Sequence, residues 1–411
     1  MDNLKIRFYD HDDELKETIF ANEDVSTSSE ENDTGVNEKP STSSEEHYTS
    51  DLSDQDNHHK TTCIERCKNK KSFRNNYKII TEISKGGQGT VFEVLKITDN
   101  GNYAMKLVPV DLDDFQASKY NEAIASRKLL SHDNIVSYHT SHVFYTSPKK
   151  DSDVVMDEEK YIACLMIVTE LCKESLEDMI KSGDIFNDDE RRCKVFLGIL
   201  NGVQFIHEKN YIHRDLKPEN ILIGKDGKAK ICDFGLAWSK DRSLEVDTPD
   251  SRKSEKSLTK DIGSYYYIAP EVKAENNRPY DRKADFYSIG LIVYEMYVKM
   301  DKSERPRRFE KLRAGNFAPL DYIENEKVKE IVKSLLSHDP SLRMELTEVK
   351  QAIEDLMKND NLVEGNQVLV LHQEVSSVTR YPSPQRRQSI EGQKNGKLQF
   401  SNKENVHWKH Y

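Results

Sequence analysis

The chain has 411 residues, of which 36% are apolar and 32% charged, and its formal net charge is −11. Average globular domains are about 45–50% apolar and about 25% charged, so the composition predicts an ordered core diluted by polar flanks. No run reaches the roughly 18 apolar residues of a membrane span, the first twenty residues are too acidic for a secretory signal, and the negative charge disfavours general binding to nucleic-acid phosphates.

The acidic charge is concentrated in the first 59 residues, which hold 17 acidic and 4 basic side chains. The hexapeptide STSSEE occurs there twice, at 26–31 and 41–46. Such a segment buries too little apolar surface to offset its chain entropy. We therefore predict that residues 1–72 form a disordered acidic, Ser-rich tail, with acidic-directed phosphorylation as a sharper alternative. Residues 359–411 are predicted to form a polar C-terminal tail.

Six cysteines are spread over the chain and form no disulfide framework, so a reducing compartment is expected: the cytoplasm, with the nucleus left open. Cys63 and Cys67, with His58 and His59 upstream, offer a metal site as an alternative. Their spacing fits no common zinc pattern, however, and the surrounding residues are polar. We therefore expect no metal at these positions.

Between the tails, residues 73–358 change in texture from strands to helices. Strand-like runs come first, at 77–83, 90–97 and 102–110. The Asn100-Gly101 pair before the last run is the strongest short hairpin signal. Apolar residues then recur at helical spacing over 191–209, and the run 285–298 is apolar nearly all round, which predicts a helix buried in a sizeable core.

The order of elements predicts an α+β fold with two lobes, a small β-rich N-lobe over about 77–172 and a larger helical C-lobe over about 173–358. A crevice between two such lobes is a favoured place for a ligand. Residues 83–94 read ISKGGQGTVFEV, and glycines in a turn between strands let backbone amides approach phosphate oxygens. Lys106, on the strand that follows, would lie beneath that turn. Taken alone, a plain hairpin turn and an edge-strand lysine in water are the simpler interpretations.

Two further motifs change that balance, because residues 211–222 read YIHRDLKPENIL and residues 231–236 read ICDFGL. The sequence here resembles the eukaryotic protein kinases, whose catalytic loop reads HRDLxxxN and whose metal loop reads DFG. The resemblance covers about 77–358. It implies the two-lobed protein kinase fold, a phosphotransferase activity, and ATP and Mg²⁺ as cofactors.

The resemblance assigns roles to individual residues. It implies that Asp215, with Lys217 beside it, accepts the proton of the attacking hydroxyl, and that Asn220 and Asp233 ligate Mg²⁺. Lys106 is the third catalytic residue and holds the alpha and beta phosphates. The expected nucleotide-binding residues come from the glycine turn, the strands beneath it, the partner helix of the lysine and the hinge: Ile83, Ser84, Lys85, Gly86, Gly87, Gln88, Gly89, Val91, Ala104, Lys106, Glu122, Thr169, Glu170, Cys172 and Leu222.

Two of these positions depart from the family pattern. Glu122 is the expected ion-pair partner of Lys106, although the stretch after it is one residue longer than the usual spacing. Ser84 replaces the first glycine of the family's phosphate loop, which leaves Gly86 and Gly89 in place.

Lys217 is a residue that serine and threonine kinases share and tyrosine kinases lack. Ser264, in the run GSYYYIAPE, occupies the position where such kinases carry a Ser or Thr. The resemblance also implies that Arg214 receives an activation-segment phosphate, with Thr259 as the leading autophosphorylation site. Structural roles are implied for Arg343 as the partner of Glu271 and for Asp285 as a brace of the catalytic loop.

Several short features resemble the kinases that phosphorylate the alpha subunit of translation initiation factor 2. One is SERPRRFEKLRAGNFAP at 303–319, and another is an insert at about 146–160 between two strands. They imply that this alpha subunit is the protein substrate, in stress-linked translation control, and that the chain forms a homodimer. No membrane segment is expected. No nucleic-acid-binding module is expected either, because the N-terminal tail is too short for paired double-stranded-RNA domains. The sequence does not reveal the activating signal.

Two alternatives stand beside this interpretation. The first is an active serine/threonine kinase of another signalling or cell-cycle pathway. The second is a pseudokinase scaffold, which the retention of Lys106, Asp215, Asn220 and Asp233 disfavours.

Overall fold

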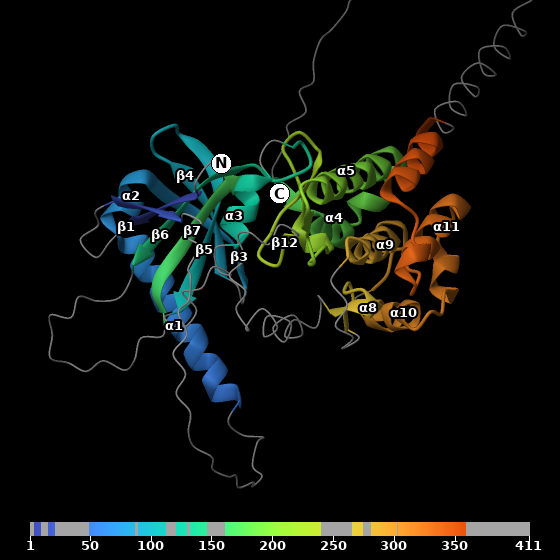
Figure 1. Ribbon diagram of the computed structural model, residues 1–411, viewed down its shortest axis with the longest axis horizontal. Helices are drawn as coiled ribbons and strands as arrows, with labels where there is room; N and C mark the ends of the chain where they lie inside the picture. The colour runs from blue at the N-terminus through green and yellow to red at the C-terminus, as the bar shows by residue number, and fades with distance from the viewer. Residues whose placement is uncertain are drawn as a thin grey trace, which may run out of the picture. The chain divides into compact units, whose positions relative to one another are not determined.

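The computed structural model describes residues 4–9, 15–20, 49–86, 89–111, 121–129, 132–145, 161–239, 265–273, 281–301 and 303–358 (Figure 1). All of them except Lys358 belong to one compact unit, Met1–Met357. Within that unit a β-rich N-lobe precedes a helical C-lobe, as the sequence predicts.

The N-lobe is built on a seven-stranded sheet with the order β2-β1-β6-β7-β5-β4-β3. Its strands are β1 (Leu4–Tyr9), β2 (Leu15–Phe20), β3 (Tyr77–Gly86), β4 (Gly89–Lys96), β5 (Gly101–Asp111), β6 (Tyr138–Tyr145) and β7 (Tyr161–Glu170). All neighbours pair antiparallel except β1 and β6, which are parallel. The predicted hairpin is confirmed, because Lys96 pairs with Gly101 and Asn100 takes a left-handed φ of 55°.

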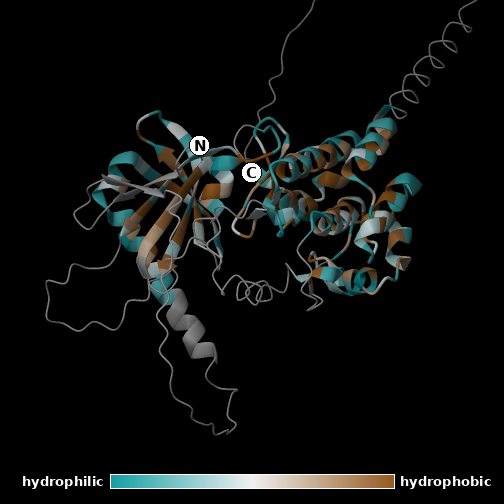
Figure 2. Ribbon diagram, viewed as in Figure 1, coloured by the Kyte–Doolittle hydropathy of each residue, from teal (hydrophilic) through white to brown (hydrophobic). Residues whose placement is uncertain are grey.

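Both faces of the central strands are buried, and Figure 2 colours these strands mostly brown for apolar residues. Alternate residues of β7 divide between two cores: Cys164, Met166 and Val168 face one, while Leu165 and Ile167 face the other. Helix α1 (Thr49–Asn69) and the short helix α2 (Lys71–Asn76) contribute to the first core, and α3 (Asn121–Lys128) contributes to the second. The central strands are therefore covered on both sides, which fixes the strand that carries Lys106.

The prediction of a disordered tail over residues 1–72 is corrected by β1, β2, the whole of α1 and the start of α2, which lie within it. Helix α1 buries Cys63, Ile64 and Cys67, which share one helical face, and Cys63 Sγ donates to the backbone oxygen of Ala163 at 3.3 Å. This apolar stripe escaped notice because the acidity of the whole segment outweighs it. The remainder of that tail, and residues 359–411, lie outside the described residues.

The C-lobe consists of helices and three short strand pairings. Its main helices are α4 (Leu176–Ser182), α5 (Asp189–Glu208), α8 (Pro270–Lys273), α9 (Lys283–Tyr297), α10 (Glu304–Arg313), α11 (Glu326–Leu335) and a helix over residues 346–358. The strands β8 (Glu174–Ser175), β10 (Ile221–Ile223) and β11 (Ala229–Ile231) form one sheet, and β9 (Tyr211–Ile212) pairs with β12 (Trp238–Ser239). Single 3-10 turns lie at Asp184–Phe186, Pro218–Asn220, Ala318–Tyr322 and Pro340–Leu342.

The two helices that the sequence predicts most strongly are confirmed. The periodic apolar residues of α5 are buried, and in α9 every residue from Ala284 to Met296 is buried. A helix that is buried on all sides is a rigid support for the loops packed against it. Asp285 on α9 anchors the catalytic loop by accepting hydrogen bonds from its backbone.

Candidate active site

Lys106 brings three distant parts of the chain together. It lies on β5 opposite Val91 of β4 and Ile167 of β7. Its Nζ lies 2.8 Å from Glu122 Oε2 on α3 and 3.1 Å from Asp233 Oδ1, just after β11. The expected pair of Lys106 and Glu122 is thus confirmed despite the altered spacing after the glutamate.

Burial and charge act in opposite directions on this trio. Burial alone would lower the pKa of Lys106, but Glu122 and Asp233 together raise it above its ordinary value. Burial raises the pKa of Glu122, and Lys106 opposes that rise. Burial also disfavours ionisation of Asp233, yet Lys106 holds the pKa of this carboxyl below its ordinary value. The lysine is therefore a fixed cation and Asp233 a fixed anion at neutral pH.

The catalytic loop follows β9 and is held from below by Asp285. Its Oδ2 accepts from the backbone N–H of His213 and its Oδ1 from that of Arg214, both at 3.0 Å. Arg214 and Asp233 both have left-handed backbones, with φ of 69° and 61°, a strained conformation that such contacts sustain. His213 Nε2 lies 3.0 Å from the backbone oxygen of Cys232, which ties the loop to the Asp233 segment.

Asp215 and its two neighbours form the other half of the site. Lys217 Nζ lies 2.9 Å from Asp215 Oδ2. Asn220 Nδ2 donates to the backbone oxygen of Asp215 at 2.7 Å and to its Oδ2 at 3.0 Å. Both partners hold the Asp215 carboxylate in one orientation, where it accepts hydrogen bonds.

The oxygen atoms left by these contacts fit Mg²⁺. Because the nitrogen of the Asn220 amide is bound to Asp215, its oxygen is the atom that can ligate; Asp233 uses Oδ1 toward Lys106 and retains Oδ2. Among the described residues, no three His, Cys, Asp or Glu side chains lie close enough together to hold a metal ion. This finding includes the surroundings of Cys63 and Cys67. Two oxygen ligands are consistent with Mg²⁺, which keeps waters and substrate phosphates in its shell.

The glycine turn joins β3 to β4, with Gly86 paired to Gly89, Lys85 to Thr90 and Ser84 to Val91. Gly87 and Gln88 lie outside the described residues. At Gly89 φ is +141°, and an added Cβ would overlap the backbone oxygen of Leu107. Ile83 is half exposed. Lys85 Nζ lies 3.3 Å from Thr61 Oγ1 on α1.

The expected hinge residues lie at the end of β7 and directly after it. Ala104 on β5 lies opposite Thr169, one residue before Glu170. The Glu170 carboxylate accepts from the backbone N–H of Ser137 at 2.7 Å and from Lys230 Nζ at 3.0 Å, so this side chain braces the hinge. Sequence reasoning missed Lys230, because a lysine in a short strand carries no local signal.

The other two expected nucleotide-binding residues lie nearby. Burial raises the pKa of Cys172 to about 12, so its thiol stays protonated. Leu222 lies on β10 between Lys230 and Ser175.

The activation segment is described only at its ends. The Arg214 guanidinium lies 5.2 Å from the ring centre of Trp238, a neighbour that the sequence does not predict. Thr259 and Ser264 lie outside the described residues. At the far end, Arg343 binds both carboxylate oxygens of Glu271, at 2.6 and 2.8 Å, which confirms the expected pair.

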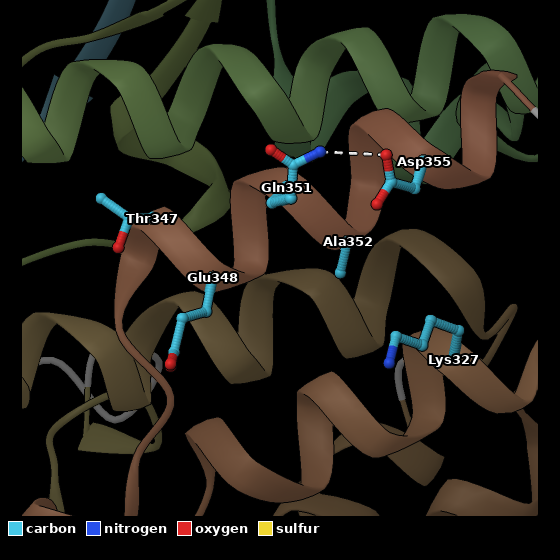
Figure 3. Close-up of a pocket in the computed structure, with 6 residues that line it drawn as sticks. All are labelled: Lys327, Thr347, Glu348, Gln351, Ala352 and Asp355. Atoms are coloured by element: carbon cyan, nitrogen blue, oxygen red, sulfur yellow. Dashed lines mark hydrogen bonds between the residues drawn. The ribbon is translucent and has the colours of Figure 1, made fainter.

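A separate, open pocket lies between α11 and the helix over residues 346–358 (Figure 3). All but one of its lining residues are polar, and Gln351 Nε2 donates to Asp355 Oδ1 at 2.9 Å. None of the expected site residues lines it. In the described part of the chain, no helix has the length and apolar character needed to cross a membrane.

Comparison with known proteins settles the family. The family model described as protein kinase domain matches residues 77–353. The chain belongs to the protein kinase family. ATP and Mg²⁺ are the substrate and the usual ion of this family, and both suit the residues described above. Helix α1, which packs on the kinase N-lobe, precedes the matched range.

Several kinases are similar in sequence. The human eIF-2-alpha kinase GCN2 is 36% identical over 228 residues, which are 52% of this chain and 14% of that protein. The mouse interferon-induced, double-stranded RNA-activated protein kinase is 32% identical over 286 residues, 68% of this chain and 51% of that protein. The human serine/threonine-protein kinase Nek10 is 28% identical over 297 residues, 70% and 24% respectively. The matched part thus spans about half or less of each relative.

Proposed function

We propose that this kinase transfers the gamma phosphate of ATP to serine or threonine hydroxyls, and that its substrate is the alpha subunit of translation initiation factor 2. The observation that carries the proposal is the convergence of Lys106 and Asp233, 3.1 Å apart, with the adjacent group of Asp215, Lys217 and Asn220. A scaffold without activity has no chemical need for this set.

Phosphoryl transfer has a loose, in-line transition state, so the residues mainly position the reactants and neutralise charge. Asp215 accepts the proton of the acceptor hydroxyl. The oxygen of that hydroxyl bonds to the gamma phosphorus, while the bond between the gamma phosphorus and the oxygen that bridges it to ADP breaks and ADP leaves. Burial opposes a charge on Lys217, but Asp215 raises the pKa of Lys217, so its ammonium stays available to the transferred phosphoryl group. Asn220 and Asp233 would hold Mg²⁺, and the bound ion would add a further positive charge at the phosphates.

The choice of substrate is supported by the relatives whose names specify eIF-2-alpha kinases and by the segment 303–319. The test is phosphate incorporation from Mg-ATP into the purified alpha subunit by the full chain, with D215N as the inactive control. Incorporation by the wild type alone supports the proposal, and its absence on that subunit contradicts it. From the resemblance noted in the sequence analysis we also propose a homodimer, which sedimentation of the purified chain tests.

A second candidate is a serine/threonine kinase with another protein substrate. The similarity to Nek10, which bears no translation-factor name, favours it. Incorporation into a generic serine substrate without incorporation into the initiation-factor subunit supports this candidate.

A further inference from the structure

Three of the six cysteines lie together in the core between helix α1 and strand β7. Cys63 and Cys67 are about one helical turn apart on α1, and Cys164 lies on β7. Their side chains are at most 2% exposed and belong to the same apolar cluster. None of them takes part in phosphoryl transfer, so the proposed function leaves this group of thiols without a role.

The thiol of Cys164 contacts the other two. Cys63 Sγ donates to the backbone oxygen of Ala163, the residue before Cys164, at 3.3 Å. Cys164 forms thiol hydrogen bonds with both Cys63 and Cys67, although the three do not surround one point as a metal ion requires. Cα atoms of α1 and β7 approach within 8 Å of one another, close to the roughly 4.4–6.8 Å that a disulfide spans. A small shift of α1 toward the sheet therefore brings Cys164 within bonding distance of a cysteine on the helix.

Packing keeps these thiols unreactive. The thiolate is the form of cysteine that reacts, and burial raises the pKa of Cys164 well above its ordinary value. The hydrogen bond from Cys63 opposes this rise, whereas Cys67 adds to it. An oxidant in water therefore reacts only when α1 opens locally from the sheet, because an exposed cysteine has a pKa of about 8.5.

Helix α1 is held to the sheet by a narrow apolar contact. Among its described side chains, only Cys63, Ile64 and Cys67 are buried. Two of these three are cysteines, which bury less apolar surface than a leucine or phenylalanine would. A contact at the margin, between Lys85 Nζ and Thr61 Oγ1 at 3.3 Å, is exposed to water. Segments held by few buried contacts open most readily, so we expect α1 to open before the sheet unfolds.

We propose that these thiols form a peroxide-sensitive site, in which a disulfide between Cys164 and either Cys63 or Cys67 joins α1 to β7. A thiolate exposed by opening attacks a peroxide oxygen, the O–O bond breaks, and the cysteine becomes a sulfenic acid while the other oxygen takes up a proton and leaves as water. The second thiol attacks the sulfenic sulfur, the S–O bond breaks, and a second water leaves. Two thiols are thereby oxidised to one disulfide, and one hydrogen peroxide is reduced to two waters.

The test treats the full chain with hydrogen peroxide, alkylates the remaining thiols and digests with pepsin without reduction. Mass spectrometry is expected to find a β7 peptide joined to an α1 peptide, lighter by two hydrogen atoms than the sum of the two reduced peptides. C164A and the double variant C63A/C67A should lose this link, whereas C63A and C67A alone should keep it. The double variant decides the question if C164A fails to fold. C193A removes a buried cysteine of α5 and is the matched control, expected to behave as the wild type.

Limited trypsin digestion reports on the opening of α1 and does not depend on kinase activity. Cleavage after Arg66 and Lys68 requires α1 to open, so peroxide should slow it at least about tenfold in the wild type and in C193A. Peroxide should leave the rate unchanged in C63A/C67A, and dithiothreitol should restore the original rate in the wild type. The proposal would be overturned by a disulfide between Cys63 and Cys67 alone, by the absence of any link between α1 and β7, or by equal cleavage of α1 before and after the link forms.

Discussion

Replacing Glu122 by Gln tests how the site holds its lysine. The substitution removes the carboxylate 2.8 Å from Lys106 Nζ and retains the shape of the side chain. Lys106 is then left with Asp233 as its remaining anionic partner, and it is drawn toward the residue proposed to ligate Mg²⁺. We therefore expect a loss in phosphate positioning without a loss of packing.

The magnitude follows from the kind of contact that is lost. A hydrogen bond to a charged group contributes about 1.5–3 kcal/mol, and about 1.4 kcal/mol corresponds to a factor of ten in rate, so kcat/KM for ATP should fall about 10- to 150-fold. The folding cost should be small, because burial already raises the pKa of Glu122 and so disfavours its charged form.

The assay is steady-state kinetics with ATP as the varied substrate, together with a thermal melt of each protein. E93Q, on the neighbouring strand β4, changes a glutamate that bonds Asn102 outside the site and is the matched control. An E122Q enzyme with wild-type kcat/KM would refute the role of the pair. A variant that loses activity only because its melting temperature collapses would refute the separation of positioning from packing.

Three further predictions concern pH, the glycine turn and the activation segment. Burial raises the pKa of Glu295 to about 7 in the folded chain, against about 4.5 in the unfolded chain, so the free energy of unfolding should fall by about 3 kcal/mol as pH rises from about 4.5 to 7. E295Q should flatten this pH profile of stability, and equal profiles for E295Q and the wild type would contradict the burial argument. G89A should lose about 1–3 kcal/mol of stability in a denaturant melt, whereas G86A, with open space around it, should melt like the wild type. T259A, which cannot be phosphorylated at residue 259, should lower activity at least tenfold relative to S257A. A fully active T259A enzyme would rule out this switch.

The parts of the site that the sequence predicts are those encoded in short contiguous motifs. Asp215 and Asn220 lie in one loop and Asp233 in the next, so local spacing alone identifies them. Lys106 follows from the hairpin at Asn100-Gly101, which fixes its register. These predictions need no knowledge of contacts between distant segments.

The features that the sequence misses depend on long-range packing. Helix α1 buries Cys63 and Cys67 against the sheet, but the acidic average of its segment hides the stripe. The pairing of β1 with β6 joins strands more than a hundred residues apart. Arg305 and Glu177 are separated by 128 residues, so no local pattern links them. Such partners become visible only when the fold brings them together.

The most direct measurement is single-turnover transfer from gamma-labelled ATP by the full chain and by D215N, with nucleotide binding measured by calorimetry alongside. Our account predicts that both proteins bind Mg-ATP, whereas only the wild type transfers the label to protein. Absence of nucleotide binding by the wild type, or equal transfer by D215N, would contradict the assignment of Lys106, Asp215, Asn220 and Asp233 to one phosphoryl-transfer site.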